Sequence, residues 1–194
     1  GLARAALVVV VCLPALAMAA AYLDGSIRAS PFRALTQESG LWAMRFLVLG
    51  LLLGPLRDLT GWAGFARARQ TVGLAGFFYT ALHLLVWARQ YGFEGGFLVE
   101  EIAARRYLAV GAGAATALVP LALSSPARLH RALGERAWRR LHLLIHPAVG
   151  AAYVHYAMAR GFTRTEVVAQ GAALLFAFGW RLARRGSRRV GSPL

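Results

Sequence analysis

The sequence predicts an all-α membrane protein, a bundle of six transmembrane helices, from three observations. Of its 194 residues, 58% are hydrophobic and only 15% are charged, a balance that soluble domains of this size rarely have. The charged residues lie in short clusters between long apolar runs. A helix needs about 20 mostly apolar residues to cross a bilayer, and six runs reach or approach that length. The formal net charge of +14 therefore does not indicate nucleic-acid binding, because the cations are not gathered on one face.

The predicted helices form a single domain that spans the whole chain. Their ranges are 5–23, 41–57, 70–91, 106–124, 138–159 and 166–183. The first resembles a signal peptide, but we predict a retained helix because similar helices follow it. Pro14, Pro120 and Pro147 lie inside these ranges, and membrane helices tolerate proline better than soluble helices do. The small residues that begin at Gly111 would let helices approach closely, although simple enrichment in Gly and Ala explains them equally well.

The placement of arginine predicts how the helices are oriented. Fourteen of the 22 arginines lie at the N-terminus, in the loop at 58–69 together with Arg57, in the loop at 125–140 and in the tail from Arg181. Seven lie in the three opposite loops. Cytoplasmic loops carry the excess of positive charge, so both termini are predicted to be cytoplasmic. The tail from Arg181 to Arg189 is then a topology anchor at the anionic leaflet, with partner binding as the alternative.

Four of the five histidines fall in the third and fifth predicted helices. They are His83, His142, His146 and His155, whereas His130 lies in the basic loop at 125–140, where we expect it to be solvated. Burying an imidazole in hydrocarbon costs free energy unless the ring forms a hydrogen bond or binds a ligand. Four imidazoles on two helices favour a bound cofactor, and hydrogen bonds between helices remain the simpler alternative.

The spacing of these histidines predicts two levels between the same two helices. His83 follows Arg69 by 14 residues, and His155 follows His142 by 13. Each separation is about 20 Å along a helix. We therefore expect His83 and His155 at an outer level, suited to axial ligation of a haem iron, and His142 with Arg69 at an inner level. A spacing of 13 residues does not keep two side chains on one helix face, so this arrangement requires a distortion at Pro147.

Two further sets of residues have competing interpretations. His142 and His146 are one turn apart and could bind zinc, but no intramembrane Asp, Glu or Cys completes a ligand set near them. The arginines near the outer level either extend to the membrane interface or pair with haem propionates. These are Arg45, Arg105 and Arg106.

Several short motifs distributed over nearly the whole chain carry a resemblance to a known family. They are Pro31, Ser39-Gly40, Gly54-Pro55-Leu56, Arg69 to Leu74, Leu82-His83-Leu84, Arg105 to Leu108 with Gly111, Leu133-Gly134 with Trp138 to His142, and His155-Tyr156. On these motifs the sequence resembles the MsrQ or YedZ family. Its members are membrane haem-binding subunits of bacterial periplasmic methionine sulfoxide reductase systems and belong to the ferric-reductase-like transmembrane group.

The resemblance implies a ferric-reductase-like bundle of six helices in the bacterial inner membrane, with b-type haem. It implies that electrons pass from the quinone pool or a cytoplasmic flavin donor to a periplasmic molybdenum-cofactor subunit, which repairs oxidised methionine. It maps haem ligands onto His83, His142 and His155, and the inner arginine onto Arg69. FMN and quinone are further cofactors that it implies, although no pattern in this chain indicates a flavin site.

The sequence departs from the family at His146-Pro147, where an apolar or aromatic residue is usual. His146 is then an extra ligand, a quinone contact, or a packing residue with a local hydrogen bond. The short tail after Arg181 leads us to expect an electron donor that is a separate molecule. We expect an electron-transfer subunit rather than the catalytic subunit. A stand-alone ferric or cupric reductase and a cofactor-free transporter or scaffold remain the alternatives.

Overall fold

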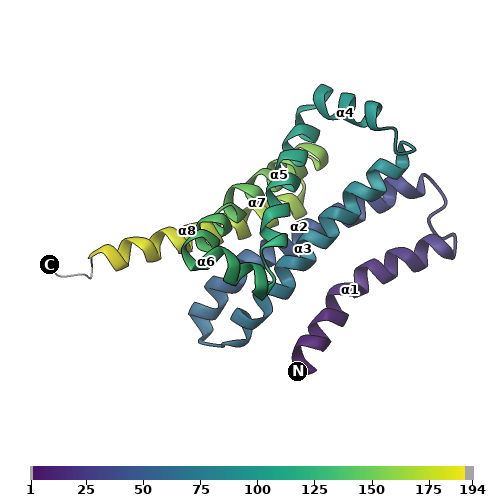
Figure 1. Cartoon of the computed structure of the whole chain (residues 1–194). Helices are drawn as coiled ribbons and strands as arrows, with labels where there is room; N and C mark the ends of the chain where they lie inside the picture. Colours follow the sequence, from purple (N-terminus) through teal and green to yellow (C-terminus); the bar gives the residue numbers. More distant parts are fainter. Residues whose placement is uncertain (1, 191–194) are drawn as a thin grey trace.

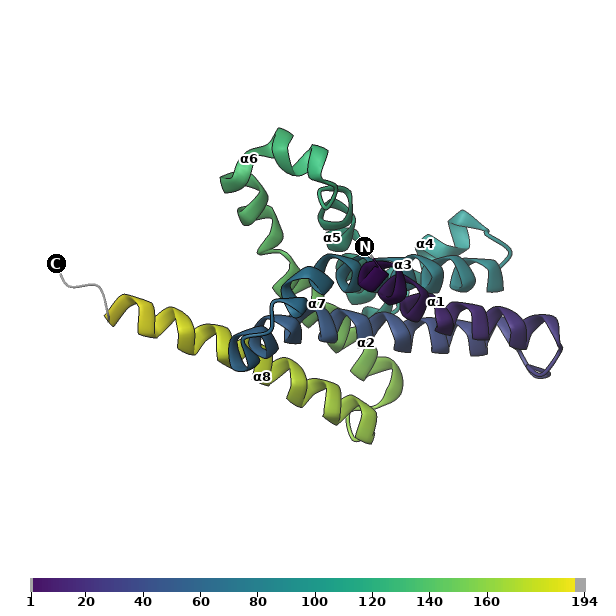
Figure 2. The same cartoon turned by 90° about the horizontal axis from the view of Figure 1, so that it is seen from below.

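The computed structural model describes the backbone of residues 2–190 and the side chains of residues 2–184. The described part is helical throughout, apart from the connections. Its helices are α1 (Leu2–Leu23), α2 (Pro31–Thr60), α3 (Gly64–Gln90), α4 (Gly95–Ala104), α5 (Arg106–Leu123), α6 (Ala127–His142), α7 (Ile145–Arg160) and α8 (Thr165–Val190). Helices α2, α3, α5, α7 and α8 pack in a bundle, and α1 lies along its edge against α3 (Figure 1). Helix α4 lies across one end of the bundle, the α4 end, and α6 stands out near the other, the α6 end (Figures 1 and 2).

The long helices alternate in direction along the bundle. Helices α1, α3 and α7 run toward the α4 end, and α2, α5 and α8 run toward the α6 end (Figure 1). Among the described residues, four helices are long and apolar enough to cross a membrane, namely α1, α2, α3 and α5. Helix α7 has 16 residues, so it is about 24 Å long, shorter than the hydrocarbon core of about 30 Å. The prediction of an all-helical membrane protein is confirmed, and length and composition support four of the six predicted crossings.

The helix ends differ from the predicted ranges where proline or polar residues lie. The predicted range 106–124 matches α5 within one residue. Helix α2 begins ten residues earlier than predicted, at Pro31, whose fixed φ suits the first turn of a helix. The segment 31–40, expected to be a loop, is therefore helical and extends α2 toward the α4 end.

The predicted single helix at 138–159 is wrong, because the chain breaks it at Leu143 and Leu144. Pro147 has no N–H to donate to the Leu143 carbonyl. That carbonyl instead accepts from the backbone N–H of His146 at 3.2 Å, in a tighter turn. The prediction of a loop at 125–140 is also wrong, since most of this segment is helix α6. This helix changes direction at Gly134, whose φ of 73° is one that glycine adopts readily.

Helix α8 is attached to α2 through polar contacts near the α6 end. Pro55 leaves the Leu51 carbonyl without a donor in its own helix, and Arg181 donates to that carbonyl at 2.7 Å. Arg184 pairs with Asp58 at 2.7 Å. These contacts fix the described part of the predicted basic tail against the bundle. The side chains of Arg185, Arg188 and Arg189 lie outside the described residues.

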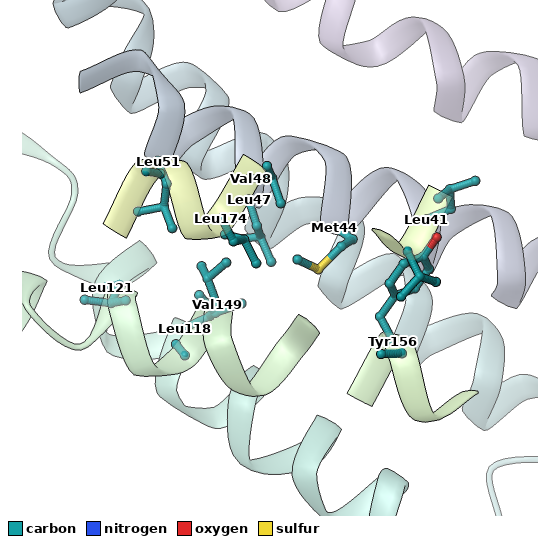
Figure 3. Close-up of a cluster of buried hydrophobic side chains, with 14 residues drawn as sticks. Leu41, Met44, Leu47, Val48, Leu51, Leu118, Leu121, Val149, Tyr156 and Leu174 are labelled. Atoms are coloured by element: carbon teal, nitrogen blue, oxygen red, sulfur yellow. The ribbon is translucent and has the colours of Figure 1, made fainter. Parts of the chain in front are cut away.

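A buried apolar cluster joins α2, α5, α7 and α8 at the centre of the bundle (Figure 3). Its labelled members are Leu41, Met44, Leu47, Val48, Leu51, Leu118, Leu121, Val149, Tyr156 and Leu174. Lipid tails are as apolar as these side chains, so the hydrophobic effect does not drive the helices together. Close van der Waals packing of this kind holds them together instead.

Helix α1 is held by one fully buried tyrosine of α3. The Tyr79 hydroxyl accepts from the backbone N–H of Ala15 at 2.9 Å and donates to the carbonyl of Val11 at 2.8 Å. In a regular helix these two backbone groups would bond each other. The hydroxyl is thus inserted into the hydrogen-bond ladder of α1 beside Pro14, a recognised cause of local helix distortion.

We predict that Tyr79→Phe lowers the free energy of unfolding by about 1 kcal/mol, the scale of hydrogen bonds between membrane helices. Equilibrium unfolding in mixed detergent micelles measures this loss. Tyr22→Phe is the matched control, because Tyr22 is exposed near the C-terminal end of α1. An equal effect of the two substitutions would contradict the inserted hydroxyl.

Candidate cofactor site

Two cavities lie one after the other along the bundle. The α4-end cavity, of about 480 Å³, is lined by His83 and His155. The α6-end cavity, of about 660 Å³, is lined by Arg69 and His142. Both volumes fall in the range of roughly 300–1,000 Å³ that is typical of ligand and cofactor sites. The structure therefore brings together the residues of each predicted level.

The two cavities share part of their lining. Leu47 of α2 and Leu118 of α5 belong to both linings and to the buried cluster of Figure 3. Gly76 of α3 allows α2 to approach here, since a Cβ at this position would lie 2.8 Å from the Leu47 side chain. The partition between the cavities is thus thin and apolar.

In the α4-end cavity, His83 of α3 and His155 of α7 are neighbours, with ring centroids 6.2 Å apart and ring planes at 75° to each other. A metal–imidazole bond is about 2.0–2.1 Å long, and a ring nitrogen lies about 1.1 Å from the ring centre. Two imidazoles on opposite sides of one metal ion therefore have centroids about 6.3 Å apart. The observed separation fits one metal ion held between the two rings.

Backbone carbonyls fix which nitrogen of each ring is available. His83 Nδ1 lies 2.8 Å from the Thr36 carbonyl oxygen of α2, and His155 Nδ1 lies 2.7 Å from the Tyr107 carbonyl oxygen of α5. A carbonyl only accepts hydrogen bonds, so Nδ1 carries the proton in both rings. Each Nε2 then keeps its lone pair, which is the form of histidine that ligates a metal, and the Nδ1 hydrogen bond is the usual second contact of such a ligand.

The arginines of the α4-end cavity differ in part from those predicted. Arg105 lines it and pairs with Glu101 at 2.7 Å. Arg45 lines neither cavity, and its guanidinium carbon lies 4.5 Å from the centre of the Trp42 ring. Arg33 and Arg160 line the cavity, and the sequence analysis did not single them out. The helix-start signal at Pro31 could have placed Arg33 on α2.

In the α6-end cavity an indole lies between two imidazoles. Trp138 stacks on His142 with centroids 3.8 Å apart and on His130 with centroids 4.4 Å apart. His142 Nδ1 lies 3.2 Å from the Trp138 carbonyl oxygen. His130, expected to be a solvated loop residue, lies on α6 instead of in a loop; it lines the cavity, and 38% of its side chain is exposed. The amphipathic pattern of α6 was the signal that would have revealed this arrangement.

The second half of α6 carries a charged contact at the surface. Glu135 accepts from Arg139, and His130 Nε2 lies 2.9 Å from a Glu135 carboxylate oxygen. Arg139, and then His130, hold the pKa of Glu135 below its ordinary value. The carboxylate therefore stays charged at neutral pH and links the two sides of the change in direction at Gly134.

His146 also lines the α6-end cavity, one turn beyond His142 and past the break in the helix. Its Nδ1 lies 3.1 Å from the Leu143 carbonyl oxygen, and its ring lies 5.9 Å from that of Phe178. Within the described residues, no three His, Cys, Asp or Glu side chains come together as a structural or catalytic zinc site requires.

The chain is similar to proteins of one family over most of its length. A family model described as the ferric reductase like transmembrane component matches residues 39–153. Three similar proteins are named protein-methionine-sulfoxide reductase heme-binding subunit MsrQ. That of Azospira oryzae is 34% identical over 94% of this chain and 79% of its own length. That of Rhodospirillum rubrum is 38% identical over 80% and 75%, and that of Xanthomonas campestris pv. campestris is 37% identical over 84% and 75%. No solved structure gives a significant match.

We predict that, in the protein without cofactor, both His83 and His155 are the tautomer protonated at Nδ1. The carbonyls of Thr36 and Tyr107 leave no other hydrogen-bonded form. Nitrogen-15 NMR of histidine-labelled protein measures this, with His83→Ala and His155→Ala assigning the signals. Protonation at Nε2 in either ring would contradict the geometry.

Proposed function

This chain belongs to the ferric-reductase-like transmembrane family and, within it, to the haem-binding MsrQ subunits, and we propose that it carries electrons across the bacterial inner membrane through b-type haem. The single observation that carries this proposal is the pair of imidazoles in the α4-end cavity. They lie 6.2 Å apart, and both are held with Nε2 available. Haem supplies the one-electron chemistry when bound, and the protein supplies its ligands, orientation and surroundings.

We propose that His83 and His155 would hold the haem iron at the α4 end. The hydrogen bonds from their Nδ1 atoms to Thr36 and Tyr107 make the imidazoles better electron donors and fix their orientation. Haem held by these two imidazoles would supply electron transfer rather than binding of a substrate to the metal.

Three arginines of the same cavity are suited to the carboxylates of haem. Arg33, Arg105 and Arg160 line it and come from α2, the start of α5 and the end of α7. Guanidinium groups form the strongest hydrogen bonds with carboxylates. The proposed propionate contacts therefore lie at these three residues, whereas the position of Arg45 over Trp42 favours its extension to the membrane interface.

The α6-end cavity is the proposed inner level of the electron path. His142 is its proposed metal ligand and Arg69 a cofactor-binding residue, for a second haem, a quinone or FMN. Its larger volume and mixed apolar and cationic lining are compatible with each of these flat molecules. The shared lining at Leu47 and Leu118 supports a direct relay between the two levels.

Six crossings of the membrane complete the proposed topology. Helices α7 and α8 would supply the two that length and composition alone do not support, and the alternating directions of the helices in Figure 1 favour this assignment. The excess of arginine at the α6 end favours a cytoplasmic α6 end and a periplasmic α4 end.

The proposed electron path thus starts from quinol or a cytoplasmic flavin donor at the α6 end. It leads to a periplasmic molybdenum-cofactor methionine sulfoxide reductase at the α4 end. This chain would be the electron-transfer subunit, and the repair of oxidised methionine would take place on the partner.

We predict that His83→Ala and His155→Ala each abolish the low-spin b-type absorption of the α4-end haem. Each substitution removes one of two axial ligands. Dithionite-reduced spectra of protein purified in mild detergent, with haem quantified per chain by pyridine haemochrome, measure the effect. Retention of the wild-type spectrum in both variants, or a colourless wild-type protein expressed with ample haem, would contradict the assignment of His83 and His155 as haem ligands.

We also predict that His142→Ala changes the redox behaviour of the cofactor at the α6 end and leaves the absorption spectrum of the α4-end haem intact. The two levels have separate ligands and separate cavities. The measurement is redox titration followed by absorption, together with reduction of the wild-type and variant proteins by a quinol analogue. A His142→Ala variant that loses the low-spin signal of the α4 end would mean that the levels are not separate.

A further inference from the structure

Both histidines of the α4-end cavity lie against a glycine of the neighbouring helix. A Cβ added to Gly40 of α2 would lie 2.8 Å from His83 Nδ1, and one added to Gly111 of α5 would lie 2.6 Å from His155 Nδ1. Real Cβ atoms essentially never approach another atom within 3.0 Å. At each position the three nearest atoms all belong to the histidine ring. The two rings therefore occupy the space that any other residue would fill with its side chain.

Each glycine has the same register relative to the carbonyl that its histidine contacts. Gly40 follows Thr36 by four residues, and Gly111 follows Tyr107 by four. Residues four apart lie one above the other on one face of a helix. One helical turn thus presents an accepting carbonyl and, beside it, an α-carbon with no side chain. The same arrangement occurs twice, between α2 and α3 and between α5 and α7.

We propose that Gly40 and Gly111 are positioning residues for the two proposed haem ligands, and that each acts by leaving room for an imidazole to reach the carbonyl one turn earlier. This inference rests on the proposed function. A methyl group at either position would push the ring away, lengthen the hydrogen bond from Nδ1 and displace Nε2 with the ring. Ligand geometry must be held within about 0.5 Å for a site of this kind to work, and a contact under 3.0 Å cannot be relieved without a shift of that order.

The test compares alanine substitutions at glycines that differ only in what their Cβ would meet. Gly40→Ala and Gly111→Ala should each weaken haem retention by about 10–100-fold, the usual cost of losing a contact that orients a metal ligand. The reduced spectrum should lose low-spin character, and the midpoint potential of the remaining haem should shift. Gly113→Ala and Gly150→Ala are the controls, because nothing lies within 4 Å of an added Cβ at either position.

The controls should keep the wild-type spectrum and potential, since alanine is also the better helix former. Haem content, spectrum and potential of the Gly40→Ala and Gly111→Ala variants that match those of the controls would overturn the inference and leave the proposed function standing. A wild-type protein without haem would overturn the proposed function itself. The two failures are therefore distinguishable.

A double-mutant cycle tests the inference through stability, so it needs no bound haem and also applies to variants that fold poorly. In the His83→Ala background the ring that Gly40→Ala would meet is gone, so the second substitution should cost little additional stability. Thermal unfolding in detergent of the wild-type protein, both single variants and the double variant measures the coupling. His155→Ala with Gly111→Ala forms the same cycle on α5 and α7. Equal costs of the glycine substitution in both backgrounds would overturn the inference, because they would indicate a general packing defect.

Discussion

Hydrogen bonds from side chains to backbone carbonyls of neighbouring helices are the interaction on which the geometry of this bundle depends. A helix uses each carbonyl once, and hydrocarbon offers no water for the remaining polar groups. His83 and His155 each donate to a carbonyl of a neighbouring helix, as do Tyr79 and Arg181. Arg181 donates to the Leu51 carbonyl, which has no donor in its own helix because Pro55 lacks an N–H. A proline in α2 thus creates the acceptor for a side chain of α8. Side chains that would be costly in an apolar interior are thereby satisfied without other polar side chains.

This dependence links the packing of the helices to the chemistry of the cavities. Helices α2 and α5 supply carbonyls, and α3 and α7 supply the imidazoles that donate to them. A change in the distance between α2 and α3 therefore changes the direction of His83 Nε2, because its Nδ1 is fixed to α2. The close approach of these helices, at Gly76 as well as Gly40, is thus a condition for the geometry of the α4-end cavity and for the thin partition at Leu47.

The sequence predicted the long apolar helices, except for the break at Leu143, and it grouped His83 with His155 and Arg69 with His142, because these depend on composition and on counting residues along a helix. The spacing of His83 from Arg69 was sufficient to place them in different cavities. Helices α4 and α6 were missed because they are short and, in α6, strongly charged, so hydropathy does not reveal them. The carbonyl partners were not predictable at all, since the contact of His155 with Tyr107 depends on the register between two helices. Gly40 and Gly111 belong to motifs that carry the family resemblance, and only the structure gives them a physical reason.

The two levels are built with different degrees of constraint, which bears on their proposed roles. His83 and His155 lie within uninterrupted helices and are each fixed by a carbonyl of another helix. His142 is the last residue of α6, directly before the break at Leu143, and its Nδ1 contacts a carbonyl of its own helix. Its ring stacks on that of Trp138, which also belongs to α6. A ligand at a helix end beside a break can adjust its position at lower cost than one fixed between two helices. This difference favours the α6 end as the level that exchanges electrons with a mobile donor, and the α4 end as the level whose geometry is fixed.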